Sequence, residues 1–413
     1  MVDSCHSRAP SDASTTARDA AAEIARVLRE HGHIAYFAGG CVRDQLLGLE
    51  PKDWDVATTA TPAEIQSLFR RTHGVGQAFG VVLVNVLGHS IEVTTFRAEG
   101  GYSDGRRPDE VRYAGPEEDA RRRDFTINGL FQDPATGAII DLVGGQEDLK
   151  RGVIRAIGDP QERLREDRLR MLRAVRFAAR YGFSIDPVTE LAIRQNPPSL
   201  GGVSRERIGL ELELMLAHPT RARAAELVQS VSLDSPVLQE EHRDRPLVRL
   251  RALPPQATYP EALAAWWLDR HAKDASTAAS RRWRSALVLS NEVTDRFASI
   301  LDAHRVLRDD WDRLPVARRK RQAAGASFAP ALGILLAEDS PRAAAIRAEM
   351  DELASTGLAP RPFIDGRVLL DLGVPGGPAF GRILEEVYDA QLEGRVATAA
   401  EAAELARRLA RRT

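Results

Sequence analysis

Two aspartates separated by one residue, Asp53 and Asp55, are the side chains in this sequence that most directly suggest chemistry. Residues two apart on an extended strand point to the same side, so the two carboxylates would lie next to each other. Like charges held together are unfavourable unless a cation lies between them, and two-metal phosphoryl transfer needs such a site. The pair therefore predicts a metal site, with a solvated strand edge as the alternative.

Two glycines, Gly39 and Gly40, precede the aspartates and follow a predicted buried strand at residues 34–37. Glycines let backbone N–H groups approach a phosphate closely, here at the start of a helix whose dipole favours anions. Arg43 lies in the first turn of that helix, where it could hold a triphosphate oxygen. The glycines alone would indicate only a turn, but residues 39–55 taken together predict binding of phosphate and metal.

A third carboxylate, Glu92, lies in a predicted strand at residues 91–96. Alternation along a strand should point Glu92 away from its apolar neighbours Ile91 and Val93. If that face lies beside the two aspartates, Glu92 would complete the site. Spacing alone favours an exposed strand glutamate.

Residues 121–129, RRRDFTING, place three arginines on one short segment, and these could neutralise phosphate. Asn128 in the same segment offers both a donor and an acceptor to a ribose hydroxyl. The alternative is a solvated basic run packed behind Phe125 and Ile127.

Residues 166–177 repeat polar side chains at every third position within a predicted single helix at residues 162–181. The spacing predicts a polar stripe that spirals along this helix. Asp167 and Arg170 together could imitate a base-pairing edge, although an ordinary surface ion pair would have the same spacing. The stripe consists of Asp167, Arg170, Arg173 and Arg176.

Several of these segments resemble the class II nucleotidyltransferases, the superfamily that contains the tRNA CCA-adding enzymes and the bacterial poly(A) polymerases. The resemblance rests on GGCVRDQLLG (39–48), KDWDVATTATP (52–62), RRDFTIN (122–128) and the ED–R pattern at 166–170. It is dense over residues 35–218, sparse after that, and returns at 362–394.

The resemblance implies roles for the candidate residues. Asp53 and Asp55 would bind Mg²⁺, and Glu92 would activate the 3′-hydroxyl of the RNA. Asp167 and Arg170 would select CTP or ATP in place of a template. The other residues implied to bind the nucleotide are Gly40, Arg43, Arg123, Asn128, Arg173 and Arg176.

Other segments are given supporting roles by the same resemblance. Residues 141–149 would form a hinge, and residues 204–207 would support the neck without touching substrate. Residues 364–394 are similar to the tail that grips tRNA in many bacterial CCA-adding enzymes. The basic run at 318–321 is compatible with RNA contact and with a solvated helix face.

The 413 residues suggest two to four domains, with mixed strands and helices in the first half and helices in the second. We therefore expect an α+β fold: a β-sheet head followed by all-α domains. The expected helices are 20–31, 162–181 and 205–217, the expected strands also include 81–86 and 138–141, and a mobile loop is expected at 100–115. The predicted divisions are a disordered lead-in (1–19), head (20–155), neck (156–224), body (225–355) and tail (356–413).

Composition excludes several classes of protein. Two cysteines exclude a disulfide framework and indicate a reducing compartment, from which we expect a cytoplasmic protein. No apolar stretch is long enough to favour a membrane span. The net charge of −2 means that any RNA-binding surface must come from local clustering.

We therefore expect an enzyme that adds C, C and A to the 3′ end of tRNA from CTP and ATP, with release of pyrophosphate. A poly(A) polymerase is an alternative because the head motifs are shared. An enzyme that adds only A also remains open, whereas the intact loop at residues 100–113 argues against one that adds only CC. A non-catalytic RNA-binding protein is the alternative from another class, and the oligomeric state stays open.

Overall fold

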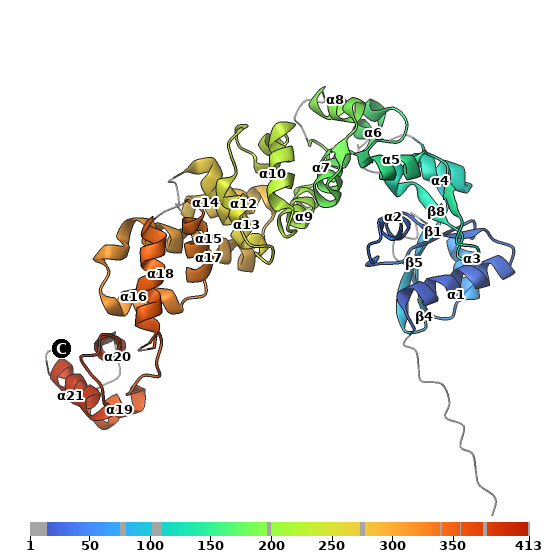
Figure 1. The fold of residues 1–413 in the computed structure, drawn as a ribbon. Helices are drawn as coiled ribbons and strands as arrows, with labels where there is room; N and C mark the ends of the chain where they lie inside the picture. Colours follow the sequence, from blue (N-terminus) through green and yellow to red (C-terminus); the bar gives the residue numbers. More distant parts are fainter. Residues whose placement is uncertain are drawn as a thin grey trace, which may run out of the picture. The chain divides into compact units, whose positions relative to one another are not determined.

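The computed structural model describes residues 15–74, 80–100, 110–195, 200–272, 277–338, 341–355, 357–374 and 378–411. Most of the predicted lead-in and the loop motif at 104–108 lie outside these residues. The chain forms two compact units. The first ends at Glu211 and also includes Val231–Pro236, and the second comprises Leu212–Ser230 and the chain from Val237 onward. The expected α+β class is confirmed, because sheet and helices share the first unit and helices make up the second (Figure 1).

A seven-stranded mixed sheet forms the centre of the first unit, in the order β3-β4-β5-β2-β1-β8-β9. β2 and β5 run parallel to each other, and the other neighbouring pairs are antiparallel. The strands are β1 (Ala35–Ala38), β2 (Val56–Thr58), β3 (Thr72–Gly74), β4 (Val81–Val86), β5 (His89–Thr95), β8 (Leu130–Gln132) and β9 (Ile139–Asp141).

Helix α1 (Ala17–Glu30) packs against β1, β2, β4 and β5 (Figure 1). It begins three residues before the predicted start at Ala20, so the lead-in predicted for residues 1–19 is too long. The reason is a capping box in which Thr16 and Asp19 satisfy each other's backbone N–H groups. Ile24 and Leu28, one turn apart, are buried together against the sheet.

A second core lies around Phe96 and Phe131, whose rings meet edge to face with centroids 5.6 Å apart. Ala38 and Ala57 from the sheet and Ala120 from helix α4 (Pro116–Arg122) complete it. Full burial of each phenylalanine is worth about 2 kcal/mol. This core fixes α4, and with it the arginine-rich segment that follows, onto the sheet.

The loop predicted at residues 100–115 is shorter than expected. Arg97–Gly100 and Glu110–Tyr113 pair as the antiparallel strands β6 and β7. The prediction missed both strands because Gly and charged residues dominate the segment and hide its alternation.

The single helix predicted at residues 162–181 is wrong. Two helices, α6 (Pro160–Glu166) and α7 (Leu169–Tyr181), occupy this region. Asp167 between them is extended, with φ −145° and ψ 102°, and its Oδ1 accepts from the Leu169 N–H at 3.0 Å. A short acidic side chain that bonds nearby backbone N–H groups competes with helix continuation. Asp167 is therefore not part of the predicted helical stripe.

The remaining elements of the first unit are short. Two small strands, β10 and β11, pair in parallel next to α7. These elements are α2 (Gly40–Leu46), α3 (Pro62–Leu68), α5 (Gly145–Arg151), β10 (Val153–Ile154), β11 (Ser184–Ile185) and α8 (Pro187–Gln195), and α9 (Arg205–Leu216) begins in this unit.

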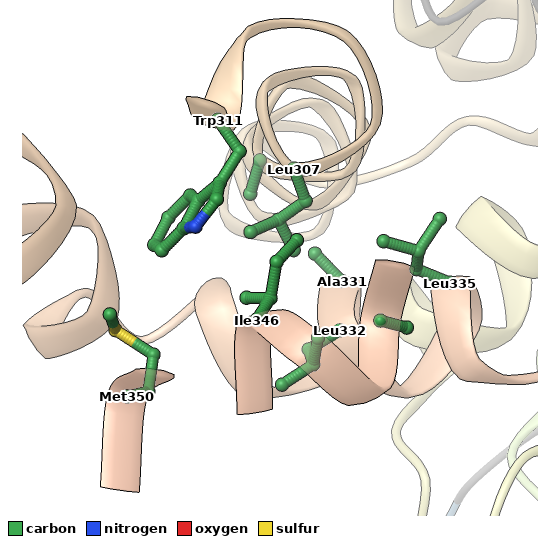
Figure 2. Packing of buried hydrophobic residues seen from close by; sticks show 9 residues of the cluster. Leu307, Trp311, Ala331, Leu332, Leu335, Ile346 and Met350 are labelled. Atoms are coloured by element: carbon green, nitrogen blue, oxygen red, sulfur yellow. The ribbon is translucent and has the colours of Figure 1, made fainter. Parts of the chain in front are cut away.

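The second unit is helical throughout its described residues. One core packs Trp311 and Leu307 against Ile346 and Met350, with Leu332 beside them (Figure 2). A separate core in residues 364–406 is centred on Leu369 and Val387. The helices are α10 (Arg221–Ser230), α11 (Asp234–Leu238), which includes residues of the first unit, α12 (Val248–Ala252), α13 (Tyr259–His271), α14 (Thr277–Leu287), α15 (Asn291–Arg305), α16 (Val316–Ala324), α17 (Phe328–Leu336), α18 (Pro341–Ala354), α19 (Gly366–Asp371), α20 (Pro378–Leu392) and α21 (Ala399–Ala410).

Within the described residues, none of the helices combines the length and the apolar character that crossing a membrane requires.

Candidate active site

A cavity of about 800 Å³ in the first unit brings the sequence-predicted residues together. Its lining contains nine arginines but only four carboxylates, so it suits a polyanionic ligand. Of the eleven candidate residues, ten line this cavity and Asp53 does not. The ten are Gly40, Arg43, Asp55, Glu92, Arg123, Asn128, Asp167, Arg170, Arg173 and Arg176.

The pairing of β2 with β5 explains why Asp55 and Glu92 meet. Val56 of β2 lies opposite Val93 of β5 in a parallel register, so the preceding residues, Asp55 and Glu92, are neighbours. Glu92 is exposed while Ile91 and Val93 are buried, as the predicted alternation requires. Sequence alternation thus gave the correct face for Glu92, but only the strand pairing places it beside Asp55.

Trp54 determines where the two aspartates point. Its ring is buried and meets Phe37 edge to face at 4.8 Å. Because neighbouring side chains alternate along extended backbone, Asp53 and Asp55 point away from this core. Asp55 continues the pairing with β1 through its carbonyl, which accepts from the Ala38 N–H at 3.1 Å. Asp53 is exposed.

The pKa of Asp55 is raised because the carboxyl is buried and other carboxylates lie close to it. Burial, followed by the charges of Glu92 and Asp53, raises the pKa of Asp55 to about 6, and Arg123 opposes the shift only in part. A carboxylate whose charged form is this unfavourable would be stabilised by a bound cation.

The carboxylates suit a hard cation, because Mg²⁺ prefers oxygen ligands and is usually bound by one or two carboxylates together with substrate phosphates. Among the residues that the structure describes, no group of three or more Asp, Glu, His or Cys side chains is arranged to hold a metal ion.

Arg43 is held in place from several sides. It is buried, forms an ion pair with Asp44 at 2.7 Å, and donates to Oδ1 of Asn128 at 2.5 Å. Gly39, which precedes α2, has a φ of 69°. This left-handed backbone conformation favours glycine, and a Cβ here would also displace the Arg123 guanidinium, whose Nη1 would lie 2.7 Å away.

Both ends of the Asn128 side-chain amide bind other residues of the cavity. Besides accepting from Arg43, its amide nitrogen donates to Asp124 Oδ1 at 2.9 Å. Arg123 donates to the Asn128 carbonyl at 3.1 Å. The Asn128 side chain therefore links α2 to the segment that follows α4.

Asp119 is a site residue that sequence reasoning missed. Its carboxylate is only 1% exposed and binds Arg122 at 2.6 Å and Arg123 at 3.0 Å. The available signal was its spacing of three and four residues before these arginines on one helix. Asp119 orients the arginine pair toward the cavity.

Arg173 and Arg176 are held by two buried acids. Arg173 pairs with Asp124 at 2.7 Å, and Arg176 pairs with Glu211 of α9 at 2.6 Å. Burial alone would raise the pKa of Asp124, but the charge of Arg173 and hydrogen bonds from Asn128, Arg173 and the Phe125 N–H lower it to about 2. Glu211 was missed because no motif connects it to residues 35 positions earlier.

Asp167 and Arg170 both reach the cavity although they do not share a helix face. Arg170 donates to Glu166 at 2.7 Å and to the Arg163 carbonyl at 2.9 Å. Oδ2 of Asp167 accepts from Arg207 of α9 at 2.7 Å. Arg207 also lines the cavity, so it lies closer to the site than a purely supporting role in the neck would require, and the prediction that residues 204–207 do not touch substrate stays untested.

The predicted hinge segment, residues 141–149, is held by internal hydrogen bonds and packs against the arginine-rich segment. The Asp141 carboxylate accepts from four consecutive N–H groups, from Val143 to Gln146, at 2.8 to 3.2 Å. A Cβ on Gly145 would lie 2.2 Å from the carbonyl oxygen of Thr126. The start of α5 thus packs directly against the arginine-rich segment.

The basic run at residues 318–321 is mostly engaged within the protein. Arg319 pairs with Glu349 at 2.5 Å, Arg321 pairs with Asp389 at 2.7 Å, and Lys320 is only 4% exposed. Arg318 is exposed. Arg319, Lys320 and Arg321 therefore do not form a simple solvated helix face, and RNA contact by this run stays a prediction.

Comparison with known families gives two matches. Residues 35–155 match the poly A polymerase head domain. Residues 182–240 match the probable RNA and SrmB-binding site of polymerase A. The first range contains the carboxylates and the segment from Asp119 to Asn128, and the second contains Arg207 and Glu211.

Similar proteins carry a consistent name. A CCA-adding enzyme of Geobacillus stearothermophilus is 41% identical over 68% of this chain and 69% of its own. One of Geobacillus thermodenitrificans is 36% identical over 90% and 92%. A crystal structure of a Bacillus stearothermophilus CCA-adding enzyme in complex with CTP has a TM-score of 0.70 and 31% identity, covering 96% of this chain and 99% of the other. The chain belongs to the CCA-adding enzyme family and is therefore a nucleotidyltransferase.

Proposed function

We propose that this chain adds C, C and A in turn to the 3′ end of tRNA, using CTP and ATP and releasing pyrophosphate. The observation that carries the proposal is one cavity in which Asp55 and Glu92 face a cluster of arginines and the Asp167–Arg170 pair. In this proposal the carboxylates of Asp55 and Glu92 take part in nucleotidyl transfer. Asp167 and Arg170 select the base of the incoming nucleotide.

In this proposal the nucleotide's triphosphate lies among the arginines. Arg43, Arg123, Arg173 and Arg176 neutralise its oxygens, and Gly40 allows the backbone to approach a phosphate closely. Asn128 sits between Arg43 and Asp124, and we assign it to the ribose. Catalysis then comes mainly from positioning and electrostatic stabilisation.

Asp53 and Asp55 are the residues that we propose hold Mg²⁺, completed by the phosphates of the nucleotide. When bound, the ion supplies stabilisation of negative charge on the reacting oxygens. Glu92 lies beside Asp55 and is placed to accept the proton of the RNA 3′-hydroxyl as this oxygen attacks the α-phosphate.

Asp167 and Arg170 read the base. Arg170 supplies donors, and the Asp167 carboxylate supplies an acceptor that Arg207 holds in one orientation. Glu166 has the same positioning role for Arg170.

The wider organisation is also proposed. We retain the neck, body and tail divisions at residues 156–224, 225–355 and 356–413, extend the head from 20–155 to include the start of α1 at Ala17, and assign tRNA binding to the tail. The cytoplasm is the compartment that we propose, in keeping with Cys41 as a free, buried thiol.

A transfer assay tests the function directly. A tRNA that ends at the discriminator base is supplied with CTP alone, with ATP alone, or with both. The proposal requires two added C residues, no addition, and a complete CCA end, respectively. A long A tract from ATP alone would instead indicate a poly(A) polymerase, and a single A added to a tRNA already ending in CC, with no C addition, would indicate an A-only enzyme.

Variants of the acidic pair test the metal assignment. Asp53→Asn and Asp55→Asn should each lower the transfer rate by at least about a thousandfold, because positioned charge stabilisation of this kind is typically worth several kcal/mol. Circular dichroism and thermal unfolding provide the folding control. Transfer close to the wild-type rate in either folded variant would refute the assignment.

A further inference from the structure

Three arginines of the cavity surround a single aromatic ring. The guanidinium carbons of Arg176, Arg43 and Arg173 lie 4.3, 5.2 and 5.4 Å from the ring centroid of Phe177. A cation within about 6 Å of an aromatic centroid is attracted by the ring quadrupole. Phe177 lines the cavity and is only 4% exposed, so water screens these contacts poorly.

The ring is itself fixed from two directions. Phe125, in the arginine-rich segment, meets Phe177 edge to face at 6.0 Å. Tyr181 stacks on it one turn later along α7, with the planes 14° apart, and its hydroxyl donates to Asp44 at 2.9 Å. Arg43 also lies 4.9 Å from the Tyr181 ring. The ring of Phe177 therefore joins α2, α7 and the segment after α4.

The arrangement lowers the electrostatic cost of gathering three arginines at one point of the cavity. Three guanidinium groups gathered around one point repel one another until a polyanion arrives. Asp124 and Glu211 offset part of this charge through their ion pairs with Arg173 and Arg176. The ring attracts all three cations without adding a negative charge that would compete with phosphate.

We propose that Phe177 is a positioning residue for the triphosphate group: its ring holds Arg43, Arg173 and Arg176 in one cluster, so that the phosphate-binding surface is formed before the nucleotide binds. The inference rests on the phosphate-binding roles proposed above for these arginines. Since the ring does not contact Asp167 or Arg170 in any interaction described, its effect is on the triphosphate and not on the choice of base.

Phe177→Leu keeps an apolar side chain but removes the quadrupole. KM for CTP and KM for ATP should rise by the same factor, about 3- to 30-fold, with kcat little changed and the order of C and A addition preserved. Binding of inorganic tripolyphosphate, measured by calorimetry, should weaken by a similar factor. Phe177→Tyr, which retains the aromatic face, should restore most of the affinity.

Matched variants separate positioning from packing. Phe297 is fully buried in α15 of the second unit, so Phe297→Leu should lower thermal stability while leaving tripolyphosphate binding unchanged. Phe177→Met provides a second non-aromatic variant with a flexible side chain if Phe177→Leu does not fold.

Two results would overturn the inference: tripolyphosphate affinity within twofold of wild type in a folded Phe177→Leu or Phe177→Met protein, or a change in KM confined to one of the two nucleotides. Tripolyphosphate binding does not require nucleotidyl transfer. A wild-type protein that binds tripolyphosphate but adds no nucleotide would therefore refute the proposed function. The positioning role of Phe177 could still be tested in that protein through its affinity for tripolyphosphate.

Discussion

At the scale of single residues, the site depends on acids that hold arginines. Asp119, Asp124, Glu211 and Glu166 each bind a guanidinium that the sequence motifs had marked for the nucleotide. The arginines could be predicted because they lie in short sequence motifs whose residue types already indicate phosphate binding. Glu211 could not be predicted, because only the packing of α9 against α7 brings it to Arg176.

Arg207 provides the prediction at this scale. Arg207→Ala leaves the Asp167 carboxylate without its ion-pair partner, so this carboxylate should no longer be held in one orientation. We expect the preference for CTP over ATP in the first addition to fall by about 10- to 100-fold, since a hydrogen bond to a charged group is worth about 1.5 to 3 kcal/mol.

The measurement is kcat/KM for each nucleotide on tRNA lacking CCA. Arg205→Ala is the matched control, because Arg205 in the same helix donates to the Pro236 carbonyl and is not among the residues that line the cavity. Unchanged selection in a folded Arg207→Ala protein would show that Asp167 needs no support from α9.

At the scale of elements, the longer strands and helices could be predicted from sequence, and the short ones and the helix break at the site could not. β4 matched the predicted range because apolar and turn residues define it locally. β2 and β8, each three residues long, gave no usable pattern, although β2 places Asp55 beside Glu92. The break between α6 and α7 was missed because a single Asp167 side chain, and no glycine or proline, produces it.

The contact between α5 and the arginine-rich segment can be tested with Gly145. Gly145→Ala places a methyl group within 2.2 Å of the Thr126 carbonyl oxygen, so α5 must move. We expect a loss of several kcal/mol in the free energy of unfolding of the first unit, or misfolding. Denaturant unfolding measures the change.

Gly333→Ala is its control. Gly333 lies in α17 with open space where the Cβ would be, so alanine should stabilise the helix by up to about 1 kcal/mol. Equal stability of both variants would mean that α5 packs less tightly than described.

At the scale of the whole molecule, charge is distributed in a way that composition conceals. The net charge is −2, yet nine arginines line one cavity of the first unit. In the second unit, His304 and Arg249 contact Glu338 in a mostly buried network. Burial alone would raise the pKa of Glu338, but hydrogen bonds with His304 and Arg249 and their charges lower it to about 2.

This network predicts how acid affects stability. A carboxyl whose folded pKa is below its unfolded pKa of about 4.3 stabilises the fold above that value and ceases to do so as pH falls through the folded pKa. Glu338 and Asp124, each with a pKa of about 2, should therefore make both units less stable between about pH 5 and pH 2. Thermal unfolding at a series of pH values measures this.

Glu338→Gln should flatten the pH dependence of the second unit while that of the first unit persists. An unaltered profile in this variant would exclude Glu338 as a source of acid sensitivity.

At least seven of the nine cavity arginines have carboxylate partners in the ion pairs described. An arginine paired in this way carries few dissolved anions for an incoming nucleotide to displace. Raising the ionic strength should therefore weaken nucleotide binding much less than nine unpaired cations would suggest. The same pairing should make the long-range electrostatic attraction of nucleotides to the cavity small. Nucleotide binding should then depend on short-range contacts, in which the arginines exchange their carboxylate partners for phosphate oxygens.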